Sequence, residues 1–557
     1  MSSPAHADPF EQSLKHVRRV LRGGEGIPED LAERLTGLLE EARGSSGDVQ
    51  PLRRAMEATA DVLRDARARE AVGGVLDLQT LRAVAGDLVG HLTRSEPPGA
   101  EPTTAQQAAW AWLDLVRHPS IARRFEGRPE QNAWLEVILS VIDASGYTVG
   151  SLWMSRVQSY GPHTFMRVPS RAASERLSWL EAGAEVDRIG KGLLALRDDV
   201  GSGRVAIFSG NRLEMALTDL ACLTTGVVNV MIPAHSTESD LLHLVTNLDV
   251  SVLIVSGEAQ LKKIRAVRQQ LPGVRAIVSF DGPSEAGSEV ISLASLIHRG
   301  RDVSDAELGR ARMSVQPEDL ATIMTTSGTT GQPKGIQFTQ RNIVSKRFAR
   351  NLAIPEIGDH DVFLCYLPLF HTFGRYLELV GCVYWGSTYV FLEDHSREGL
   401  IEAFRRHRPS VFISIPKKWM QLYEEIAEYV DLQAATDDEI HHAARGVIQD
   451  RLRWGLSAAG YLPAEIFRFF QRQGVELMSG FGMTEATGGI TMTPPGGYRD
   501  DTLGIALPGI ECRLDEDGEM MIRGPYVMVG YVAGDGSSGL DEEGWLRTGD
   551  LMDFDPA

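Results

Sequence analysis

A stretch rich in glycine and hydroxyl residues, TTSGTTGQPKG at 325–335, has the residue types of an anion site. Glycines let successive backbone N–H groups turn toward an anion, the Ser and Thr hydroxyls add donors, and Lys334 adds a positive charge. The spacing differs from that of the P-loop NTPases, because Gly335 rather than Ser or Thr follows the lysine. An ordinary surface loop has a similar composition. We predict a phosphate cradle that belongs to a different nucleotide-binding fold.

A second stretch, SGFGMTEATGG at 479–489, combines an aromatic ring with a hydroxyl and a carboxylate. Adenine needs a flat apolar partner, and stacking on a ring such as Phe481 is worth roughly 1–3 kcal/mol per base in nucleic-acid complexes. Mg²⁺ prefers hard carboxylate oxygens, and Glu485 beside the Thr484 hydroxyl would supply one. Taken alone, the segment is also compatible with a simple strand-to-loop turn.

Three further segments carry one candidate feature each. GWLRTGDL at 544–551 places Asp550 after a Thr-Gly turn, where its carboxylate could accept both hydroxyls of a ribose. CYLPLFHTFGR at 365–375 places His371 after an expected strand, and GLSAAGYLP at 455–463 is a bend of small residues before an expected helix. The alternatives are an Asp in an ordinary turn and a histidine with a purely structural role.

From about Gly146 onward, the segments that must position these residues alternate between strands and helices. We predict strands at 204–210, 227–233, 250–257, 274–280 and 319–326, and helices at 211–226, 236–248, 258–273, 342–353 and 464–474. Such alternation is typical of a parallel sheet with covering helices. The strand at 319–326 leads into the glycine-rich stretch, and open α/β sheets bind ligands at the carboxyl ends of their strands. Short alternating runs at 511–532 predict antiparallel hairpins and a small distorted β-barrel.

The first 145 residues differ from the rest of the chain, because their apolar residues recur at helical spacing throughout. PFEQSLKHVRRVL at 9–21 repeats apolar residues at helical spacing, and SEPPGAEPTT at 95–104 is a break before further helices. Aromatic residues at helical spacing, such as Trp110 and Trp134, are usually part of a core. We assign no chemistry to this region.

Composition limits the classes of function. The 557-residue chain has a formal net charge of −19, which disfavours nonspecific binding to nucleic acid. The four cysteines lack metal-ligand spacing and favour a reducing compartment. No run of about 18 apolar residues and no signal peptide is evident. We expect a cytoplasmic protein without a transmembrane segment, and peripheral membrane contact is compatible with this composition.

In their order and spacing, the five segments resemble the motifs of the adenylate-forming (ANL) superfamily of AMP-binding enzymes. This superfamily includes acyl-CoA synthetases, nonribosomal adenylation domains and luciferases. The resemblance covers about 400 residues from about 151 onward, and its finer features at 211–245, 367–391 and 409–426 are most similar to long-chain fatty acyl-CoA synthetases. Amino-acid adenylation domains carry an acidic residue that meets the substrate amine, and PLFHTFGR has none. A carboxylic acid without an amine is therefore favoured.

The resemblance implies an α/β fold in which a large adenylation domain has stacked, parallel-rich sheets. We expect a helical N-terminal extension at 1–145, an α/β adenylation (AMP-binding) core at 146–510, and a β-rich subdomain at 511–557 that ends before the family's hinge. The family continues into a small C-terminal lid domain with a catalytic lysine. We expect this lid to be absent from the chain, which would then be one part of a larger ligase.

The resemblance also implies roles for individual residues. Residues expected to hold the β- and γ-phosphates of ATP are Thr326, Ser327, Gly328, Thr329, Thr330, Gly331 and Lys334. Residues expected to enclose adenine are Ala458, Ala459, Gly460, Phe481 and Gly482. Thr484 would contact the phosphate beside the reacting carboxylate, Glu485 would bind Mg²⁺, Asp550 would hold the ribose, and His371 would lie near the carboxylate. The family usually has tyrosine where this chain has Phe481, and either ring can stack on adenine.

The implied function is ATP-dependent activation of a carboxylic acid, expected to be a long-chain fatty acid, to an acyl-adenylate with release of pyrophosphate. The acyl group would then pass to the thiol of CoA. Two alternatives remain open: a fatty acyl-AMP ligase that loads an acyl carrier protein, and a non-catalytic module that binds a nucleotide or acyl-adenylate and regulates a partner. The implied ligands are ATP, Mg²⁺ and CoA, and no nucleic-acid partner is expected.

Overall fold

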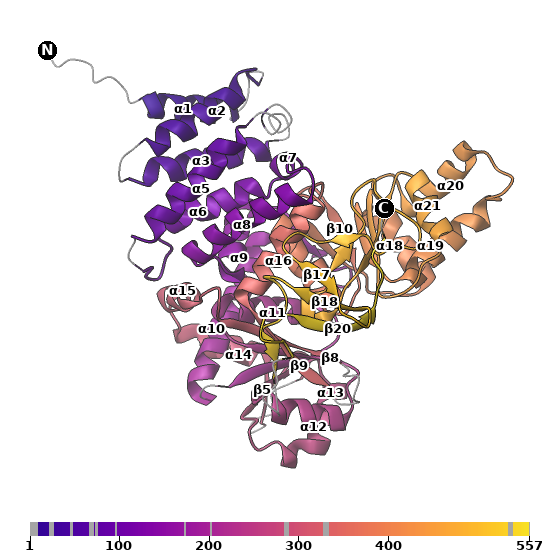
Figure 1. Cartoon of the computed structure of the whole chain (residues 1–557). Coiled ribbons are helices and arrows are strands. Elements are labelled where there is room, and N and C mark those ends of the chain that lie inside the picture. Colours follow the sequence, from indigo (N-terminus) through magenta and orange to yellow (C-terminus); the bar gives the residue numbers. More distant parts are fainter. Residues whose placement is uncertain are drawn as a thin grey trace.

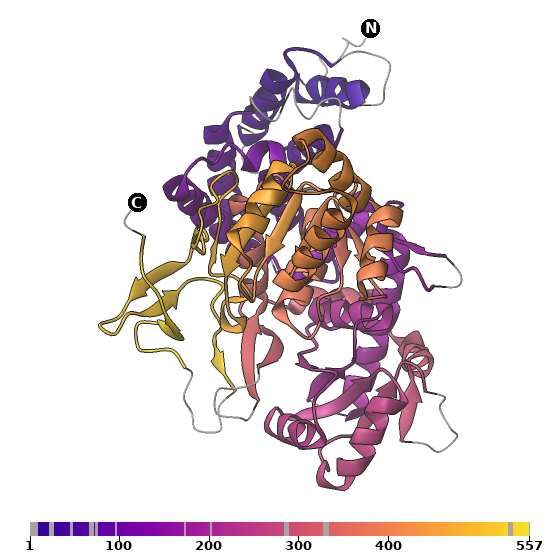
Figure 2. The ribbon, with the colours of Figure 1, turned by 90° about the vertical axis from the view of Figure 1, so that its right-hand side faces the viewer.

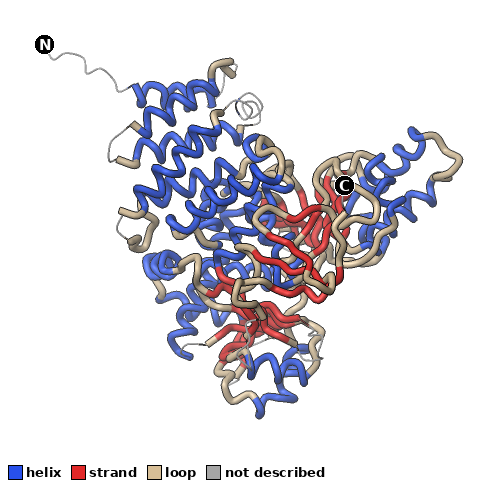
Figure 3. Tube along the Cα trace, in the orientation of Figure 1, coloured by secondary structure: helices blue, strands red, loops and turns tan. Residues whose placement is uncertain are grey.

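The structure of the chain is a computed structural model (Figure 1). It describes residues 9–21, 27–44, 48–65, 72, 76–94, 97–171, 174–200, 203–282, 289–326, 333–532 and 539–555. Strands lie in the middle of the molecule, and helices form one end of it and cover the sheets (Figure 3).

In the described part of the N-terminal region all elements are helices, as predicted (Figures 1 and 3). They are α1 (Pro9–Leu21), α2 (Leu31–Arg43), α3 (Gln50–Arg64), α5 (Leu78–Leu92), α6 (Thr104–Val116), α7 (Pro119–Ala122), α8 (Arg128–Ser145) and α9 (Val149–Tyr160). A capping box formed by Thr103 and Gln106 begins α6 after the predicted break. Trp112 is fully buried and donates a hydrogen bond to the Leu81 carbonyl at 2.9 Å. Trp110 and Trp134 are also buried, so these aromatic residues are core residues.

The helical region is joined to the rest of the chain by buried polar contacts. On α6, Asp114 accepts hydrogen bonds from Arg117 at 3.0 Å and from Arg156 of α9 at 2.5 Å. Arg117 also donates to the hydroxyl of Tyr160 at 3.2 Å. These contacts hold α6 against α9, and Arg156 joins both helices to the α/β part of the chain by donating to the Tyr384 carbonyl at 3.1 Å.

One large sheet has eight strands in the order β19-β9-β8-β4-β3-β5-β6-β7. The strands are β3 (Arg204–Phe208), β4 (Asn229–Ile232), β5 (Val250–Val255), β6 (Ala276–Ser279), β7 (Val290–Ser292), β8 (Leu320–Thr326), β9 (Lys334–Thr339) and β19 (Gly530–Tyr531). The strands from β8 to β7 run parallel, whereas β9 and β19 are antiparallel at one edge. Each of the five strands predicted from the sequence is present in this sheet.

Helices cover both faces of the eight-stranded sheet. They are α10 (Trp179–Val200), α11 (Leu213–Thr225), α12 (Glu238–Asn247), α13 (Glu258–Val267), α14 (Leu293–Arg299) and α15 (Asp305–Ser314), with short turns η1 (Arg268–Gln270) and η2 (Gly300–Asp302). Along β3, Ala206 and Phe208 pack with residues of α12 and α13, while Val205 and Ile207 face the main core. Because successive side chains of a strand point to opposite faces of the sheet, β3 places apolar side chains on both faces, as expected for a buried parallel strand.

The second large sheet has nine strands in the order β16-β15-β14-β13-β12-β10-β11-β1-β2. They are β1 (Thr164–Arg167), β2 (Arg176–Ser178), β10 (Val362–Cys365), β11 (Thr388–Phe391), β12 (Val411–Ser414), β13 (Trp454–Ser457), β14 (Glu476–Phe481), β15 (Thr491–Met492) and β16 (Ile505–Ala506). The strands from β14 to β1 are parallel, and the outer ones are antiparallel. Parallel-rich stacked sheets were the predicted fold.

The helices of this half are α16 (Gln340–Ala353), the π-helix η3 (Phe373–Leu379), α17 (Val380–Trp385), α18 (Arg397–His407), α19 (Pro416–Tyr429), α20 (Asp437–Ile448), α21 (Ala464–Arg472) and the short turn η4 (Thr484–Ala486). Orange helices, α18 to α21, cover the outer face of the nine-stranded sheet (Figure 2). On the inner side, Arg375 of η3 pairs with Asp219 of α11 at 2.5 Å and donates to Thr322 of β8 at 2.7 Å. This buried contact ties the two sheets together.

The predicted small barrel is an open sheet in the part of the chain that the structure describes. It has the order β17-β18-β20, with β17 (Glu511–Leu514), β18 (Glu519–Arg523) and β20 (Leu546–Leu551) all antiparallel. The three strands do not close into a barrel, because β19 pairs with β9 of the eight-stranded sheet and not with them. Val532 and Val529 donate to the carbonyls of Gly335 and Gln337 at 2.7 and 3.1 Å, which satisfies the open edge of β9.

Among the described residues, no single helix is long and apolar enough to cross a membrane. Helices α8 and α9 meet the criterion only as a pair, and they bend by 94° at their junction.

Candidate functional site

The predicted phosphate cradle connects two paired strands. Thr326 ends β8, Lys334 begins β9, and the two residues face each other in the antiparallel ladder. The cradle residues Ser327, Gly328, Thr329, Thr330 and Gly331 lie outside the described residues. A strand that the sequence analysis did not predict, β9, begins at the lysine, whereas a helix follows the lysine of a P-loop.

Lys334 and Glu485 are both in contact with one aromatic residue, Tyr531. The Lys334 Nζ lies 5.2 Å from the centroid of the Tyr531 ring, within reach of a cation–π interaction. The Tyr531 hydroxyl donates a hydrogen bond to Glu485 Oε1 at 2.8 Å. Burial, followed by the charge and hydrogen bond of Glu485, raises the Tyr531 pKa, so the phenol stays protonated as a donor.

Tyr531 is the residue that the sequence analysis missed. It lies about 200 residues from Lys334 in the sequence, and only the pairing of β19 with β9 brings the two together. The one local signal is the position of Tyr531 at the end of the predicted hairpin segment. That signal does not identify the strand with which it pairs.

Glu485 has the properties of a ligand for a single hard cation. Its side chain is 7% exposed, and its backbone carbonyl accepts a hydrogen bond from Met528 N–H at 2.7 Å. In the described part of the chain, no group of three or more His, Cys, Asp or Glu residues could hold a metal by itself. Mg²⁺ usually keeps several waters and takes one or two carboxylates plus substrate phosphates, so a lone carboxylate beside a phosphate cradle fits this ion.

The two predicted adenine segments lie side by side. Residues 458–460 follow β13, and Phe481 ends β14, which is parallel to β13 and paired with it from Trp454 to Ser457. Ala459 has a left-handed φ of 63°, which turns the chain sharply after the strand. Phe481 is half-buried, and Ala459 and Gly460 are exposed. The carboxyl ends of adjacent parallel strands thus form the expected edge.

The loop that carries Thr484 and Glu485 is tightly folded. A Cβ on Gly482 would lie 1.9 Å from the Gly488 carbonyl oxygen, so only glycine fits there. A Cβ on Gly488 would lie 3.3 Å from the Thr372 Cβ, which places this loop against the residue that follows His371. Thr484 and His371 therefore lie on neighbouring segments.

His371 follows β10 at the same edge of the sheet. Its ring reaches the surface and lies edge-on to the Phe373 ring at 5.7 Å, and its Nδ1 accepts a hydrogen bond from Phe373 N–H at 3.4 Å. Partial burial lowers the His371 pKa, which favours the neutral imidazole.

Asp550 belongs to the three-stranded sheet rather than to the loops that follow β10, β13 and β14. It is exposed near the end of β20, and its N–H donates to the Thr548 hydroxyl at 3.2 Å, beside Gly549 with φ of 80°. No hydrogen bond or ion pair found in the described residues joins Asp550 to the other candidate residues. Its ribose-binding role stays a prediction.

A cavity of about 650 Å³ opens beside the His371 segment. It is lined by residues that follow β3, β10 and β11, among them Asn211, Tyr366 and His395. The Asn211 side chain holds this segment, because it donates to the Leu367 carbonyl at 2.7 Å and accepts from Leu369 N–H at 2.8 Å. The cavity therefore has mixed polar and apolar walls near the candidate site.

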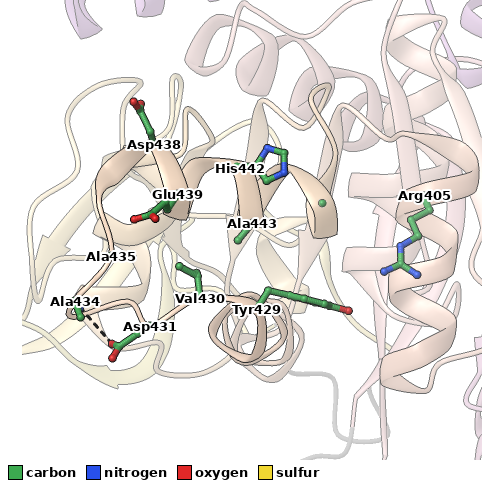
Figure 4. A pocket seen from close by; sticks show the side chains of 11 residues that line it. Arg405, Tyr429, Val430, Asp431, Ala434, Ala435, Asp438, Glu439, His442 and Ala443 are labelled. Carbon is green, nitrogen blue, oxygen red and sulfur yellow. Dashed lines mark hydrogen bonds between the residues drawn. The ribbon is translucent and has the colours of Figure 1, made fainter.

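A larger hollow, of about 990 Å³, lies among α18, α19 and α20 (Figure 4). None of the predicted site residues lines it. Two of its acidic residues have local roles: Asp431 accepts from Ala434 N–H at 3.3 Å, and Glu439 accepts from the Thr436 N–H at 2.9 Å. We assign it no part in the chemistry.

Comparisons with known proteins find relatives of this chain. The family described as AMP-binding enzyme matches residues 155–532. The chain is 24% identical over 454 residues to long-chain-fatty-acid–CoA ligase ACSBG2 of Xenopus laevis, covering 73% of this chain and 61% of that protein. It is 25% identical to long-chain-fatty-acid–CoA ligase ACSBG1 of Rattus norvegicus (84% and 70% covered). It is 26% identical to long-chain-fatty-acid–CoA ligase FadD15 of Mycobacterium bovis (67% and 66% covered). The chain thus spans between 61% and 70% of the length of these curated relatives.

Solved structures share the fold. One is the anthranilate CoA ligase AuaEII in complex with anthranoyl-AMP, with a TM-score of 0.61 and 20% identity, covering 73% of this chain and 75% of that one. Another is the N-terminal domain of FACL13 from Mycobacterium tuberculosis, with a TM-score of 0.60 and 19% identity, covering 72% and 96%. At these identities the likeness concerns the fold alone.

Proposed function

Because the chain belongs to the AMP-binding enzyme family, we propose that it activates a carboxylic acid with ATP and passes the acyl group to the thiol of CoA. The names of the curated relatives support a long-chain fatty acid as the substrate. The PLFHTFGR segment has no acidic residue for a substrate amine, which is in keeping with such an acid.

The convergence of Lys334 and Glu485 on Tyr531 carries this proposal. A phosphate-binding lysine and a carboxylate for a metal ion must act on the same polyphosphate, so they must lie close together. The 5.2 Å approach of Lys334 to the Tyr531 ring and the 2.8 Å hydrogen bond from Tyr531 to Glu485 meet this condition.

The remaining residues would complete a nucleotide site. Lys334 and Thr326, with the cradle between them, would bind the β- and γ-phosphates, and residues 458–460 with Phe481 and Gly482 would enclose adenine. Glu485 would hold Mg²⁺, which when bound neutralises phosphate charge. Asp550 would hold the ribose. We keep the division into 1–145, 146–510 and 511–557 as part of this proposal.

In the proposed reaction, an oxygen of the acid attacks the α-phosphorus while the bond to the pyrophosphate leaving group breaks. Thr484 would donate a hydrogen bond to an oxygen of that phosphate. Neutral His371 would lie near the acid carboxylate at the entrance of its pocket without adding charge. Catalysis would come from positioning and from fixed hydrogen-bond donors.

Calorimetric titration with a non-hydrolysable long-chain acyl-adenylate analogue tests the proposal. We expect the chain to bind the analogue and Asp550→Ala to lose at least tenfold in affinity. Asp553→Ala, which removes another exposed carboxylate of the same segment, is the matched control and should bind normally. Absence of binding by the unmodified chain would refute the proposed site.

A further inference from the structure

Helix α8 of the N-terminal region contacts a turn at residues 508–510. The side-chain carbonyl of Asn132 accepts a hydrogen bond from the Gly509 N–H at 3.0 Å. Leu135 lies against the same glycine, since a Cβ on Gly509 would come within 2.4 Å of the Leu135 Cδ2. The match to the AMP-binding enzyme family covers residues 155–532, so it includes the turn but begins after α8. The contact therefore joins the N-terminal region to the family's own fold.

The turn at 508–510 also packs on a second segment of the chain, residues 524–528. Gly509 has a φ of 79°, in the left-handed region that glycine adopts without strain. Its carbonyl oxygen lies 2.6 Å from the place that a Cβ on Gly524 would take, so the two backbones are in direct contact. The turn is thus in contact with both α8 and the 524–528 segment.

Tyr526 fixes the 524–528 segment to the turn. Its side chain is fully buried, and its hydroxyl donates a hydrogen bond to the Pro508 carbonyl at 2.8 Å. Asn342 of α16 holds the same segment, because its side-chain amide donates to the carbonyls of Pro525 and Val527 at 2.9 and 3.0 Å. A buried polar group that loses its partner is costly, so these bonds favour one position of the segment.

The 524–528 segment in turn holds the loop that carries the candidate metal ligand. The Tyr526 carbonyl accepts a hydrogen bond from the Thr487 hydroxyl at 3.1 Å. Two residues further along, the Met528 N–H donates to the Glu485 carbonyl at 2.7 Å. The backbone of the Glu485 loop is therefore bonded to the same segment that Tyr526 fixes to the turn below α8.

We propose that the N-terminal helical region forms part of the nucleotide site, with Asn132 as a positioning residue for Glu485. Asn132 and Leu135 hold the 508–510 turn, and the turn holds Tyr526. The segment of Tyr526 then places the Glu485 carboxylate where it would meet Mg²⁺. This role at the metal rests on the proposed function, whereas the coupling between α8 and the Glu485 loop does not. The alternative is a contact at Gly509 that only stabilises the fold.

Hydrogen exchange of the 557-residue chain, followed by mass spectrometry, tests the coupling without any ligand. Asn132→Ala removes the acceptor of the Gly509 N–H. Because local opening speeds exchange, we expect faster deuterium uptake at 505–512 and also at 523–531 and 483–490. Faster uptake confined to 505–512 would overturn the proposal, since the contact would then be local.

Two further variants control this measurement. Asn132→Asp keeps an oxygen acceptor for the Gly509 N–H and should exchange like the unmodified chain. Glu136→Ala changes an exposed position of the same helix and should leave all three segments unchanged. Faster exchange in Glu136→Ala at 483–490 would mean that any change in α8 loosens the site, which contradicts a specific role of Asn132.

Calorimetric titration with ATP tests the role at the metal. Asn132→Ala should lower the affinity for ATP in the presence of Mg²⁺ by at least about threefold, while the affinity for ATP in EDTA should stay the same. Asn132→Asp should bind ATP normally in both buffers. A contact that only stabilises the fold would lower the melting temperature without this difference between the buffers, and that result would overturn the positioning role.

Tyr526→Phe tests the next link in the same way. It removes the donor to the Pro508 carbonyl and keeps the buried ring, so it should reproduce the pattern of Asn132→Ala in both measurements. The double variant should be no weaker than the weaker single variant, because both changes break one connection. Additive losses would show that the two residues act independently, which contradicts the proposal.

Failure of the proposed function can be told apart from failure of this inference. If the unmodified chain binds no ATP, the proposed function fails, and hydrogen exchange alone decides whether α8 is coupled to the Glu485 loop. Faster exchange at 483–490 with unchanged ATP affinity in both buffers would overturn the role of Asn132 at the metal.

Discussion

The junction between α6 and α9 and the junction between α16 and the site loops both bury positive charge, but they balance it differently. At the first, Asp114 accepts from both Arg117 and Arg156. At the second, Arg347 and Arg350 have a carbonyl and a thioether as partners. Glu485 is a buried carboxylate of the candidate site. Among the described residues, its side chain accepts a hydrogen bond from the Tyr531 hydroxyl. The first junction has a carboxylate that both arginines share, although Arg156 Nη2 has no hydrogen-bond partner, whereas no carboxylate of the described residues meets Arg347 or Arg350.

The largest expected effect tests the shared carboxylate of the first junction. Asp114→Asn leaves Arg117 and Arg156 buried without a counter-charge, so we expect the free energy of unfolding to fall by about 3–5 kcal/mol. Urea denaturation measures this change. A loss below 1 kcal/mol would show that the two arginines find other partners, and the contrast with α16 would then disappear.

The pH dependence of stability sharpens the same comparison. The charges of Arg156 and Arg117 hold the pKa of Asp114 well below its usual range despite burial. A carboxyl with a depressed folded pKa adds stability above its unfolded pKa of about 3.9 and loses it as pH falls through the folded value. The stability gap between the unmodified chain and Asp114→Asn should therefore narrow below about pH 4. Denaturation curves from pH 7 to pH 3 measure the gap, and a constant gap would contradict this assignment.

At the candidate site, Glu485→Gln should weaken Mg²⁺-dependent ATP binding while the free energy of unfolding stays nearly unchanged. The substitution removes a buried charge and keeps an acceptor for the Tyr531 hydroxyl, so the free energy of unfolding should change by less than about 1 kcal/mol. Affinity for ATP in the presence of Mg²⁺ should fall at least tenfold, while affinity for ATP in EDTA should change little. Calorimetry in both buffers checks this, and an equal loss in both would argue against a metal role.

Tyr531→Phe should have a smaller effect. It keeps the ring beside Lys334 and removes the donor to Glu485, at an expected cost of about 1 kcal/mol in stability. Mg²⁺-dependent ATP binding should weaken several-fold, and the double variant with Glu485→Gln should be no weaker than Glu485→Gln alone. Additive losses in the double-mutant cycle would mean that the two residues act independently.

The smallest expected effect concerns an exposed ion pair. Arg341 pairs with Asp143 at 2.7 Å, but the Asp143 side chain is 44% exposed. Arg341→Ala should lower the free energy of unfolding by only about 0–1 kcal/mol because water screens the pair. A loss as large as that of Asp114→Asn would show that burial is not what distinguishes the two ion pairs.

Much of the α/β part could be predicted because it depends on local patterns. The apolar runs at 204–210 and 250–257 predicted strands, which the structure shows as β3 and β5. The barrel expected from 511–532 was wrong, because a local pattern of hairpins does not say which edge each strand joins. Tyr531 was missed for the same reason.

The sequence by itself determined the identities and spacing of the motif residues and some of the elements that carry them, such as β8, but not β9, which carries Lys334. Local propensity and hydrophobic periodicity act over a few residues and can be read directly. Only the tertiary structure decided which charges are paired. Arg375 and Asp219 are 156 positions apart in the chain, and Lys346 and Gly489 are 143 apart. Such partners meet because the sheets stack and α16 is buried between distant segments, and no local pattern contains that information.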